Sequence, residues 1–328
     1  MEALTVGLGS IGTRHFNNLY LLGMGGLSAL RIRNHPPPVD IPEDVKFYSD
    51  YDKALQDSPD VVVIANPTSM HVPYAQKALE AGCHVYLEKP VSHNLDGVDR
   101  LLKLQKNKNC VVQVGCKLRC HPQLVKIKEW INSGKLGSIY SVVADVGEYL
   151  PDWHPWEDYR TSYAARKDQG GGVILTMIHE IDYLYWLFGP LSVEHAIGGK
   201  RTSLEIDVED TTLITLKSAD SIPIHLRMDY WRRPPTRTLN IVAEKGEIFW
   251  DYHKKALQVF SEGELIERDR LSEDWDRNEL FLDMMKDFLT AVNGNRAVCS
   301  PLNDGIEVLK LAVRAKDQID MQEVKSLK

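Results

Sequence analysis

Cysteine is scarce in this sequence and long apolar runs are missing, and both deficits narrow the class of protein. Five cysteines occur in 328 residues, an odd number without regular spacing, so a disulfide-rich secreted scaffold is excluded and a reducing cytoplasm is expected. The chain has no run of about 18 uncharged apolar residues, which excludes a membrane-spanning helix. Its first residues also lack the basic-then-apolar order of a signal peptide, so we predict a cytoplasmic protein.

An excess of basic residues is missing as well. Lys and Arg number 39 against 46 Asp and Glu, and the formal net charge is −7, so we predict no nucleic-acid partner and no membrane partner. Cys116 and Cys120 stand four residues apart with His121 next to them, but no second cluster of ligand residues accompanies them. We therefore predict no metal site.

The first third of the sequence alternates regularly between strand and helix patterns. Apolar strand patterns lie at 4–6, 27–33, 60–65, 84–87 and 111–114, and helical patterns lie between them at 14–22, 72–81 and 95–106. Strands that alternate with helices predict a parallel sheet wound by right-handed crossovers.

The pattern changes after residue 120. Helical patterns lie at 121–133, 174–188, 280–292 and 305–317, and a strand pattern lies at 139–146. Between 191 and 260, strand patterns follow one another without helices, which predicts an antiparallel sheet. At about 100–200 residues per domain, the length also predicts two domains.

Three glycines join the first strand to the first helix. Gly7, Gly9 and Gly12 spell G-x-G-x-x-G in the strand-to-helix context that the motif requires. The first glycine allows the tight turn, the second lets the backbone approach a pyrophosphate, and the third lets the helix pack closely on the strand. The N–H groups at the helix start, with Ser10 and Ile11, would favour the anion. We predict a dinucleotide-binding Rossmann domain.

The end of the second strand is basic rather than acidic. An NAD site normally carries Asp or Glu there, which accepts hydrogen bonds from the ribose diol. In this chain Arg33 stands at that position; it cannot accept from the diol but can pair with a 2′-phosphate. The pattern favours NADP(H) over NAD(H), and a solvated basic strand end is the alternative.

Residues 65–90 read ANPTSMHVPYAQKALEAGCHVYLEKP. This stretch closely resembles the Gfo/Idh/MocA oxidoreductase family, named for glucose–fructose oxidoreductase and inositol dehydrogenase. The resemblance covers essentially the whole chain, and its E-K-P motif is specific. It implies an α/β fold with a Rossmann domain over 1–118 and a C-terminal α/β domain over 119–328 that carries a large open antiparallel sheet. It also implies oxidation or reduction of a carbinol on a carbohydrate with NAD or NADP.

By the same resemblance, the nicotinamide half of the cofactor is expected at the ends of two further strands. Pro67, Thr68 and His71, together with Asn66, would line the nicotinamide end, and Glu88 would contact the nicotinamide ribose. Thr68 stands where many members carry Asn.

The resemblance gives two residues catalytic roles. Lys89 would place an ammonium beside the reacting carbinol, where it can hydrogen-bond the oxygen and stabilise a developing alkoxide. His179, on an apolar helix after three glycines, matches the histidine that contacts the substrate hydroxyl, and Asp182 could orient it or cap a neighbour. Many members carry Asp where Thr176 stands in register with the glycines. Since Thr176 cannot act as a carboxylate base, this departure favours Lys89 over His179 as the acid–base group.

Aromatic and basic residues crowd a loop over 149–169. Aromatic faces stack on sugars or bases, and arginines bind carboxylate or phosphate bidentately, so the loop predicts a sugar nucleotide or an acidic sugar as substrate. The candidate substrate residues of this loop are Tyr149, Trp153, His154, Trp156, Tyr159, Arg160, Tyr163 and Arg166. Lys117 and Arg119, just past the last Rossmann strand, are expected to face the same cleft, although family members often have Asn at the position of Lys117. The alternative is a hydrophobic cluster under a long loop.

A second basic-aromatic stretch runs over 230–237. It could complete the anion site, or it could form a sheet rim at a subunit contact. A wide sheet with one uncovered face tends to bury that face against another copy. We therefore predict a homodimer or homotetramer.

These observations favour one function and leave two alternatives. The favoured function is hydride transfer between NAD(P) and a carbinol or ketone of a carbohydrate, as in polysaccharide or nonulosonate metabolism, with Lys89 and His179 managing the hydroxyl proton. One alternative uses bound NAD transiently for elimination, hydrolysis or epimerisation of a sugar without net redox change. The other is a non-catalytic NAD(P)-binding sensor, to which the missing relay Asp points.

Overall fold

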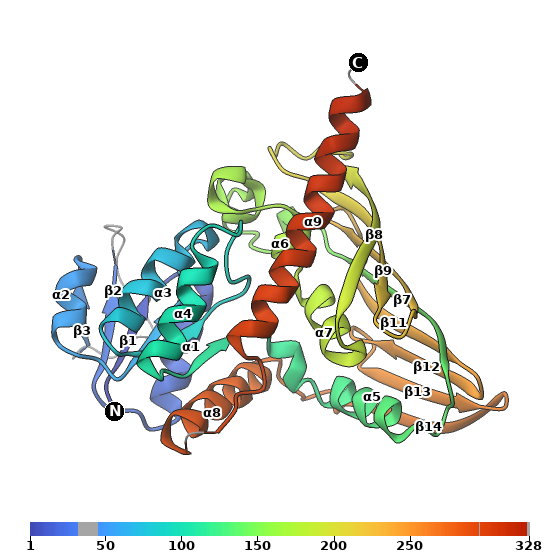
Figure 1. Ribbon diagram of the computed structural model, residues 1–328, viewed down its shortest axis with the longest axis horizontal. Coiled ribbons are helices and arrows are strands. Elements are labelled where there is room, and N and C mark those ends of the chain that lie inside the picture. The colour runs from blue at the N-terminus through green and yellow to red at the C-terminus, as the bar shows by residue number, and fades with distance from the viewer. Residues whose placement is uncertain (32–44, 295, 327–328) are drawn as a thin grey trace. The chain divides into compact units, whose positions relative to one another are not determined.

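The computed structural model describes residues 1–31, 45–294 and 296–326 (Figure 1). The chain forms two compact units. The first comprises Met1–Lys117 and Arg277–Glu307, and the second comprises Leu118–Asp276 and Val308–Lys328. The division differs from a single cut at 118/119, because the chain returns to the first unit before its last helix.

The first unit is built on a parallel sheet. Its strands are β1 (Ala3–Val6), β2 (Leu27–Leu30), β3 (Lys46–Tyr48), β4 (Val61–Ile64), β5 (His84–Leu87) and β6 (Val112–Val114). In the described part of the chain they lie in the order β3-β2-β1-β4-β5-β6, and every neighbouring pair is parallel. The order reverses at β1, and ligands of such sheets bind at the carboxyl ends of the strands next to the reversal. The predicted fold class of this unit is confirmed.

The helices that connect strands of the first unit are α1 (Ser10–Leu21), α2 (Tyr51–Gln56), α3 (His71–Glu80) and α4 (Val98–Lys108). The helix α8 (Asn278–Gly294) belongs to the segment that returns to this unit after the large sheet. All four side chains of β4 are fully buried, as expected of a strand covered on both faces. α3 ends just before Gly82, whose φ of +87° suits a residue without a side chain.

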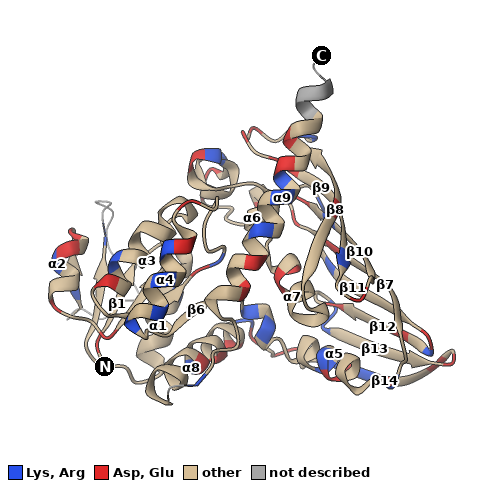
Figure 2. Ribbon diagram, viewed as in Figure 1, with Lys and Arg blue, Asp and Glu red and all other residues tan. Residues whose placement is uncertain are grey.

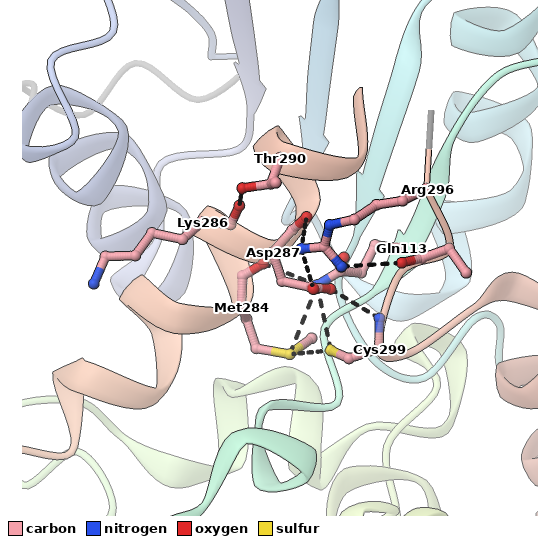
Figure 3. Close-up of polar contacts among 8 residues, drawn as sticks. Gln113, Met284, Lys286, Asp287, Thr290, Arg296 and Cys299 are labelled. Atoms are coloured by element: carbon pink, nitrogen blue, oxygen red, sulfur yellow. Dashed lines mark hydrogen bonds and ion pairs between the residues drawn. The ribbon is translucent and has the colours of Figure 1, made fainter. Parts of the chain in front are cut away.

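Polar contacts fasten the returning segment to the first unit (Figure 3). Gln113 of β6 donates from its Nε2 to the backbone oxygen of Met284, at 2.9 Å. Asp287 accepts from Arg296 Nη2 and from the backbone N–H of Cys299, each at 2.8 Å. The predicted helix at 280–292 exists, but its partners lie in the first unit rather than in the second.

The second unit is built on a large, mostly antiparallel sheet. Its strands are β7 (Ile139–Gly147), β8 (Leu191–Gly199), β9 (Thr211–Ser218), β10 (Pro223–Asp229), β11 (Thr236–Ala243), β12 (Gly246–Asp251), β13 (Ala256–Ser261) and β14 (Glu264–Arg270). Among the described residues the order is β14-β13-β12-β11-β7-β10-β9-β8. β7 precedes the others in sequence yet lies between β11 and β10, and it runs parallel to β10. The antiparallel sheet predicted over 191–260 is confirmed, and the earlier strand β7 enters its middle because the long connection after it allows a parallel pairing with β10.

Helices cover one face of this sheet and leave the other uncovered (Figure 1). The helices of the second unit are α5 (Pro122–Ser133), α6 (Val173–Thr176), α7 (His179–Phe188) and most of α9 (Leu302–Ser326). Alternate residues of β7 show the two faces: Val142, Ala144 and Val146 are buried, whereas Val143 is 48% exposed. Figure 2 shows Lys and Arg interspersed with Asp and Glu along both units. None of the helices in the described ranges combines the length and apolarity that a membrane crossing requires.

Candidate active site

The turn between β1 and α1 leaves room for an anion. Gly7 has a φ of +88°, and a Cβ on Gly12 would lie 1.9 Å from the Gly7 oxygen, so both positions require glycine. A Cβ on Gly9, in contrast, would meet nothing within 4 Å among the described residues. Gly9 is also the N-cap of α1, and no side chain of the described chain caps this helix start. The uncapped N–H groups, which include those of the predicted Ser10 and Ile11, thus fit a dinucleotide pyrophosphate.

The predicted cofactor residues after β4 form a compact turn. His71 is buried, and its Nδ1 lies 2.7 Å from the Pro90 oxygen while its Nε2 lies 3.0 Å from the Asn66 oxygen. Burial lowers the pKa of His71 despite these two carbonyls. A neutral ring carries one N–H and donates it to one of the two oxygens, which lie on the turns that follow β4 and β5. The side-chain amide of Asn66 is buried and has no partner in the described part of the protein. Such an amide fits a polar group of a nicotinamide nucleotide.

Glu88 follows β5 and lies in a buried cluster of charged groups. Its Oε1 is 2.7 Å from His15 Nε2, and its Oε2 accepts from the backbone N–H of Lys89 at 3.1 Å. Burial alone would raise the pKa of Glu88, but the hydrogen bond from His15 and the charges of His15, Lys89 and Lys117 outweigh it and hold that pKa below the usual value. The carboxylate form of Glu88 is therefore favoured by its surroundings, with His15, Lys89 and Lys117 near it.

Lys117, predicted to contact substrate, lies after β6 in the first unit. Its ammonium lies 4.5 Å from the centre of the Phe281 ring on α8, and the side chain is largely buried. Arg33, predicted to contact a 2′-phosphate, lies outside the described residues.

In the second unit His179 begins a helix of its own. The single helix predicted over 174–188 is wrong, because the chain leaves helical geometry at Met177, where ψ is 30°. α6 is fixed at its start by Glu209, whose backbone oxygen accepts from Val173. α7 takes a separate course that brings two of its carboxylates to arginines elsewhere in the unit. His179 is 4% exposed at the first position of α7.

Two buried ion pairs hold the first turn of α7, just after His179. Asp182 accepts from Arg119 Nε at 3.1 and 3.2 Å and from its Nη2 at 2.7 Å, and both side chains are at most 1% exposed. Glu180 accepts from Arg237 Nε at 2.7 Å. Burial raises the pKa of Glu180, and Arg237 opposes that rise. Asp182 therefore binds Arg119, and the histidine-orienting role of Asp182 and the substrate-facing role of Arg119 stay predictions.

The predicted substrate loop mixes buried and exposed aromatic residues. Trp153 packs its ring edge-on to Tyr230, with centroids 5.5 Å apart. Trp156 is 75% exposed, and His154 packs against it with ring centroids 5.3 Å apart. Tyr163 is also exposed. A hydrophobic cluster thus accounts for part of the loop and leaves other aromatic faces open to solvent.

The arginines of this loop and of the 230–237 stretch have carboxylate partners. Exposed pairs join Arg160 to Asp158 and Glu205, and Arg166 to Asp168. In the second stretch, Arg232 pairs with Asp145, Arg233 with Asp152 and Arg237 with Glu180. Tyr149 of the loop packs against the second stretch, with the Trp231 ring centre 5.3 Å and the Arg233 guanidinium 3.4 Å from its ring centre. Tyr159 accepts from the backbone N–H of Glu205 through its hydroxyl, at 3.1 Å.

Sequence reasoning missed three residues that shape these sites: His15, Phe281 and Glu180. Each acts through a partner at least 57 positions away along the chain. Local patterns carry no signal for such pairs. The nearest available clue was a polar His15 beside the apolar face of the first helix.

Comparisons with known proteins agree with this arrangement. Residues 1–116 match the model of an oxidoreductase family with an NAD-binding Rossmann fold, and residues 124–249 match the Gfo/Idh/MocA C-terminal domain. An uncharacterized oxidoreductase of Synechocystis is 29% identical over 209 residues, which span 57% of this chain and 53% of that protein. A myo-inositol 2-dehydrogenase of Thermotoga maritima is 25% identical and covers 98% of this chain and 96% of its own length.

Solved structures give the same fold over nearly the whole length. Levoglucosan dehydrogenase in complex with NADH and levoglucosan has a TM-score of 0.85 at 19% identity, covering 98% of this chain and 97% of its own. UDP-N-acetylglucosamine 3-dehydrogenase of Acidithiobacillus ferrooxidans has a TM-score of 0.78 at 20% identity, with 98% of both chains covered. At these identities the structural similarity shows a shared fold, and membership of a family rests on the two family-model matches. This chain belongs to the Gfo/Idh/MocA family of oxidoreductases.

Proposed function

We propose that this protein is an NAD(P)-dependent dehydrogenase or reductase that acts on a CH–OH group of a carbohydrate. The observation that carries the proposal is the uncapped start of α1, with open space over Gly9, at the reversal point of a parallel sheet. A dinucleotide held there would supply the hydride acceptor or donor. The names of the related inositol and sugar dehydrogenases support a carbohydrate substrate.

In the proposed reaction the chain handles the proton and the cofactor carries the hydride. Lys89 holds the carbinol oxygen through its ammonium and stabilises negative charge that develops there. His179 exchanges the hydroxyl proton. Thr176 offers no carboxylate for a relay, so Lys89 is the principal acid–base group.

We further propose that the substrate is anionic, either a sugar nucleotide or an acidic sugar. Arg160 and Arg166 sit in exposed ion pairs within a loop that also exposes Trp156 and Tyr163. Exposed ion pairs contribute only about 0–1 kcal/mol, so a phosphate or carboxylate can exchange for the carboxylates that these arginines now hold. The exposed rings offer a sugar or base a stacking surface. A dehydrogenase of a UDP-sugar among the structural neighbours agrees with this choice.

Two further features belong to the proposal. The first is a preference for NADP(H), which rests on Arg33 in the sequence. The second is a homodimer or homotetramer formed through the uncovered face of the large sheet. Val143, Leu213 and Val242 lie on that face and are 38–48% exposed, and apolar side chains in such a position favour a second copy.

A substrate screen tests the function directly. Purified protein is titrated with NAD(H) and NADP(H) and then incubated with neutral sugars, sugar acids and UDP-sugars while absorbance is followed in the reduced-nicotinamide band. We expect cofactor binding, with turnover largest for the anionic sugars. Product formation without net change in reduced cofactor would instead establish the elimination or epimerisation reaction. Cofactor binding without any product from the panel would favour the sensor, to which the missing carboxylate at Thr176 points.

A further inference from the structure

Two other segments of the second unit pack closely on the glycines that precede α6. A Cβ on Gly171 would lie 2.4 Å from the Tyr163 oxygen and 2.6 Å from the Ala164 oxygen, both in the predicted substrate loop. A Cβ on Gly172 would lie 2.3 Å from Glu209 Oε1. Glycine at 171 therefore makes room for the loop backbone, and glycine at 172 makes room for the Glu209 carboxylate.

Glu209 binds the first residues of α6 through its backbone and through its side chain. Its backbone oxygen accepts from the N–H of Val173 at 3.0 Å, and its Oε1 accepts from the N–H of Ile174 at 3.3 Å. Its Oε2 accepts from Lys316 Nζ on α9 at 3.0 Å, and the two side chains are 11% and 24% exposed. Lys316 thus braces the carboxylate in the place from which it contacts Ile174.

This contact lies just ahead of His179 along the chain. α6 ends before Met177, and His179 begins α7 two residues later. After His179, the first turn of α7 is held by the ion pairs of Glu180 and Asp182. Glu209 holds the chain before the break, so His179 lies between two fastened segments.

We infer that Glu209 is a positioning residue that acts through His179. Its carboxylate, braced by Lys316, fixes the start of α6 and thereby the place of the His179 ring at the start of α7. This inference rests on the proposed role of His179 in exchanging the hydroxyl proton.

Hydrogen exchange followed by mass spectrometry tests the positioning without a substrate. In Glu209→Ala we expect the amides over 172–182 to exchange about tenfold faster or more, because a hydrogen bond to a charged group is lost. Exchange over 211–218 in the neighbouring strand β9 should not change. Glu194→Ala is the matched control, since Glu194 also pairs with a lysine, Lys217, at an exposed position of the same unit. Equal exchange over 172–182 in the two variants would overturn the inference.

A second pair of variants covers the case in which Glu209→Ala does not fold. Both carry Lys316→Met, so no buried ammonium is left opposite a neutral side chain. One adds Glu209→Gln, which keeps an acceptor for the N–H of Ile174, and the other adds Glu209→Met, which keeps only the packing. We expect exchange over 172–182 to be slower in the variant with Gln than in the variant with Met. Equal exchange in these two variants would likewise overturn the inference.

Kinetics show whether the effect reaches His179. With the sugar that the substrate screen identifies, Glu209→Ala should lower kcat by roughly tenfold or more, because a misplaced reacting group loses rate steeply. In a His179→Ala background the same substitution should change kcat by less than about twofold, since residues that act as a unit are not additive. An equal loss in both backgrounds would show a merely structural role for Glu209 and would overturn the inference.

The outcomes separate this inference from the proposed function. Lost turnover in His179→Ala, together with unchanged kcat in Glu209→Ala, would overturn the inference alone. Normal turnover in His179→Ala would remove the proposed role of His179. In that case, or if no sugar of the panel reacts, faster exchange over 172–182 in Glu209→Ala would still establish that Glu209 fixes the place of His179.

Discussion

The buried pair of Arg119 and Asp182 yields a quantitative prediction for Asp182→Asn. This substitution keeps the size of the side chain but removes its charge, and it leaves the Arg119 guanidinium, 1% exposed, without its bidentate carboxylate. Breaking one side of a buried ion pair costs about 3–5 kcal/mol, because the remaining charge stays desolvated. We therefore expect the free energy of unfolding of the second unit to fall by about that amount.

Tryptophan fluorescence is a selective assay for this prediction. All seven tryptophans of the chain lie between positions 130 and 275, which places them in the second unit. At a urea dependence of about 2 kcal/mol per molar, the predicted loss moves the unfolding midpoint down by about 1.5–2.5 M. Circular dichroism reports both units, so a shift confined to fluorescence would localise the effect.

Two comparisons show whether burial is the cause. Asp168→Asn removes a carboxylate from an exposed pair with Arg166 and should cost about 0–1 kcal/mol. The double substitution Arg119→Met with Asp182→Leu removes both charges and should recover most of the stability, because well-packed apolar residues can replace a buried ion pair. A loss in Asp182→Asn no larger than in Asp168→Asn would refute the reasoning.

Four further predictions follow from the other sites. Lys89→Ala should lower turnover by roughly a hundredfold with cofactor affinity nearly unchanged. Steady-state kinetics measure the turnover and a cofactor titration measures the affinity. Near-normal turnover would contradict the acid–base role of Lys89. NADP(H) should bind more tightly than NAD(H), by about tenfold or more for one charge-assisted contact. In calorimetric titrations Arg33→Asp should narrow this difference in affinity or reverse it. Tighter binding of NAD(H) that the substitution leaves unchanged would contradict the role of Arg33. Val143→Glu together with Leu213→Glu on the uncovered sheet face should dissociate the oligomer, and light scattering that gives a monomer for the unsubstituted chain removes this prediction. Burial lowers the pKa of His121 to about 3, so below pH 6.5 the unfolded chain takes up a proton that the folded chain does not. The free energy of unfolding should therefore fall by about 2 kcal/mol at pH 5. His121→Phe should remove that fall in urea titrations followed by fluorescence.

The parts of the fold that local patterns determine were predictable from the sequence. Continuous apolar runs such as Val61–Ile64 and the glycine spacing at Gly7 encode a buried parallel strand and a tight turn within a few residues. The sequence patterns at 191–260 likewise correspond to observed strands. β14 escaped detection because its Glu-Leu-Ile-Glu-Arg-Asp-Arg sequence is mostly charged, which suits an edge strand and masks the alternation.

The parts that depend on distant partners were not predictable. The return of 277–307 to the first unit depends on contacts such as that of Gln113 with Met284, 171 positions apart. The break at Met177 accompanies ion pairs of α7 that span 57 and 63 positions. Local propensity cannot encode pairing at such separations, because it concerns only neighbouring residues. For the same reason, the residue types of the candidate site could be listed from the sequence, but their buried partners could not.

The buried partners also bear on how a proton could move near His179. The sequence places Thr176 where a carboxylate relay is usual in the family, and the structure puts two other carboxylates on the helix that His179 begins. Asp182 binds a guanidinium through several hydrogen bonds at full burial, and Glu180 binds another at 2.7 Å. Burial nevertheless raises the pKa of Glu180, and Arg237 only opposes that rise. Both carboxylates are thus already engaged by arginines within the second unit, which is the structural reason for proposing Lys89, rather than a carboxylate on α7, as the principal acid–base group.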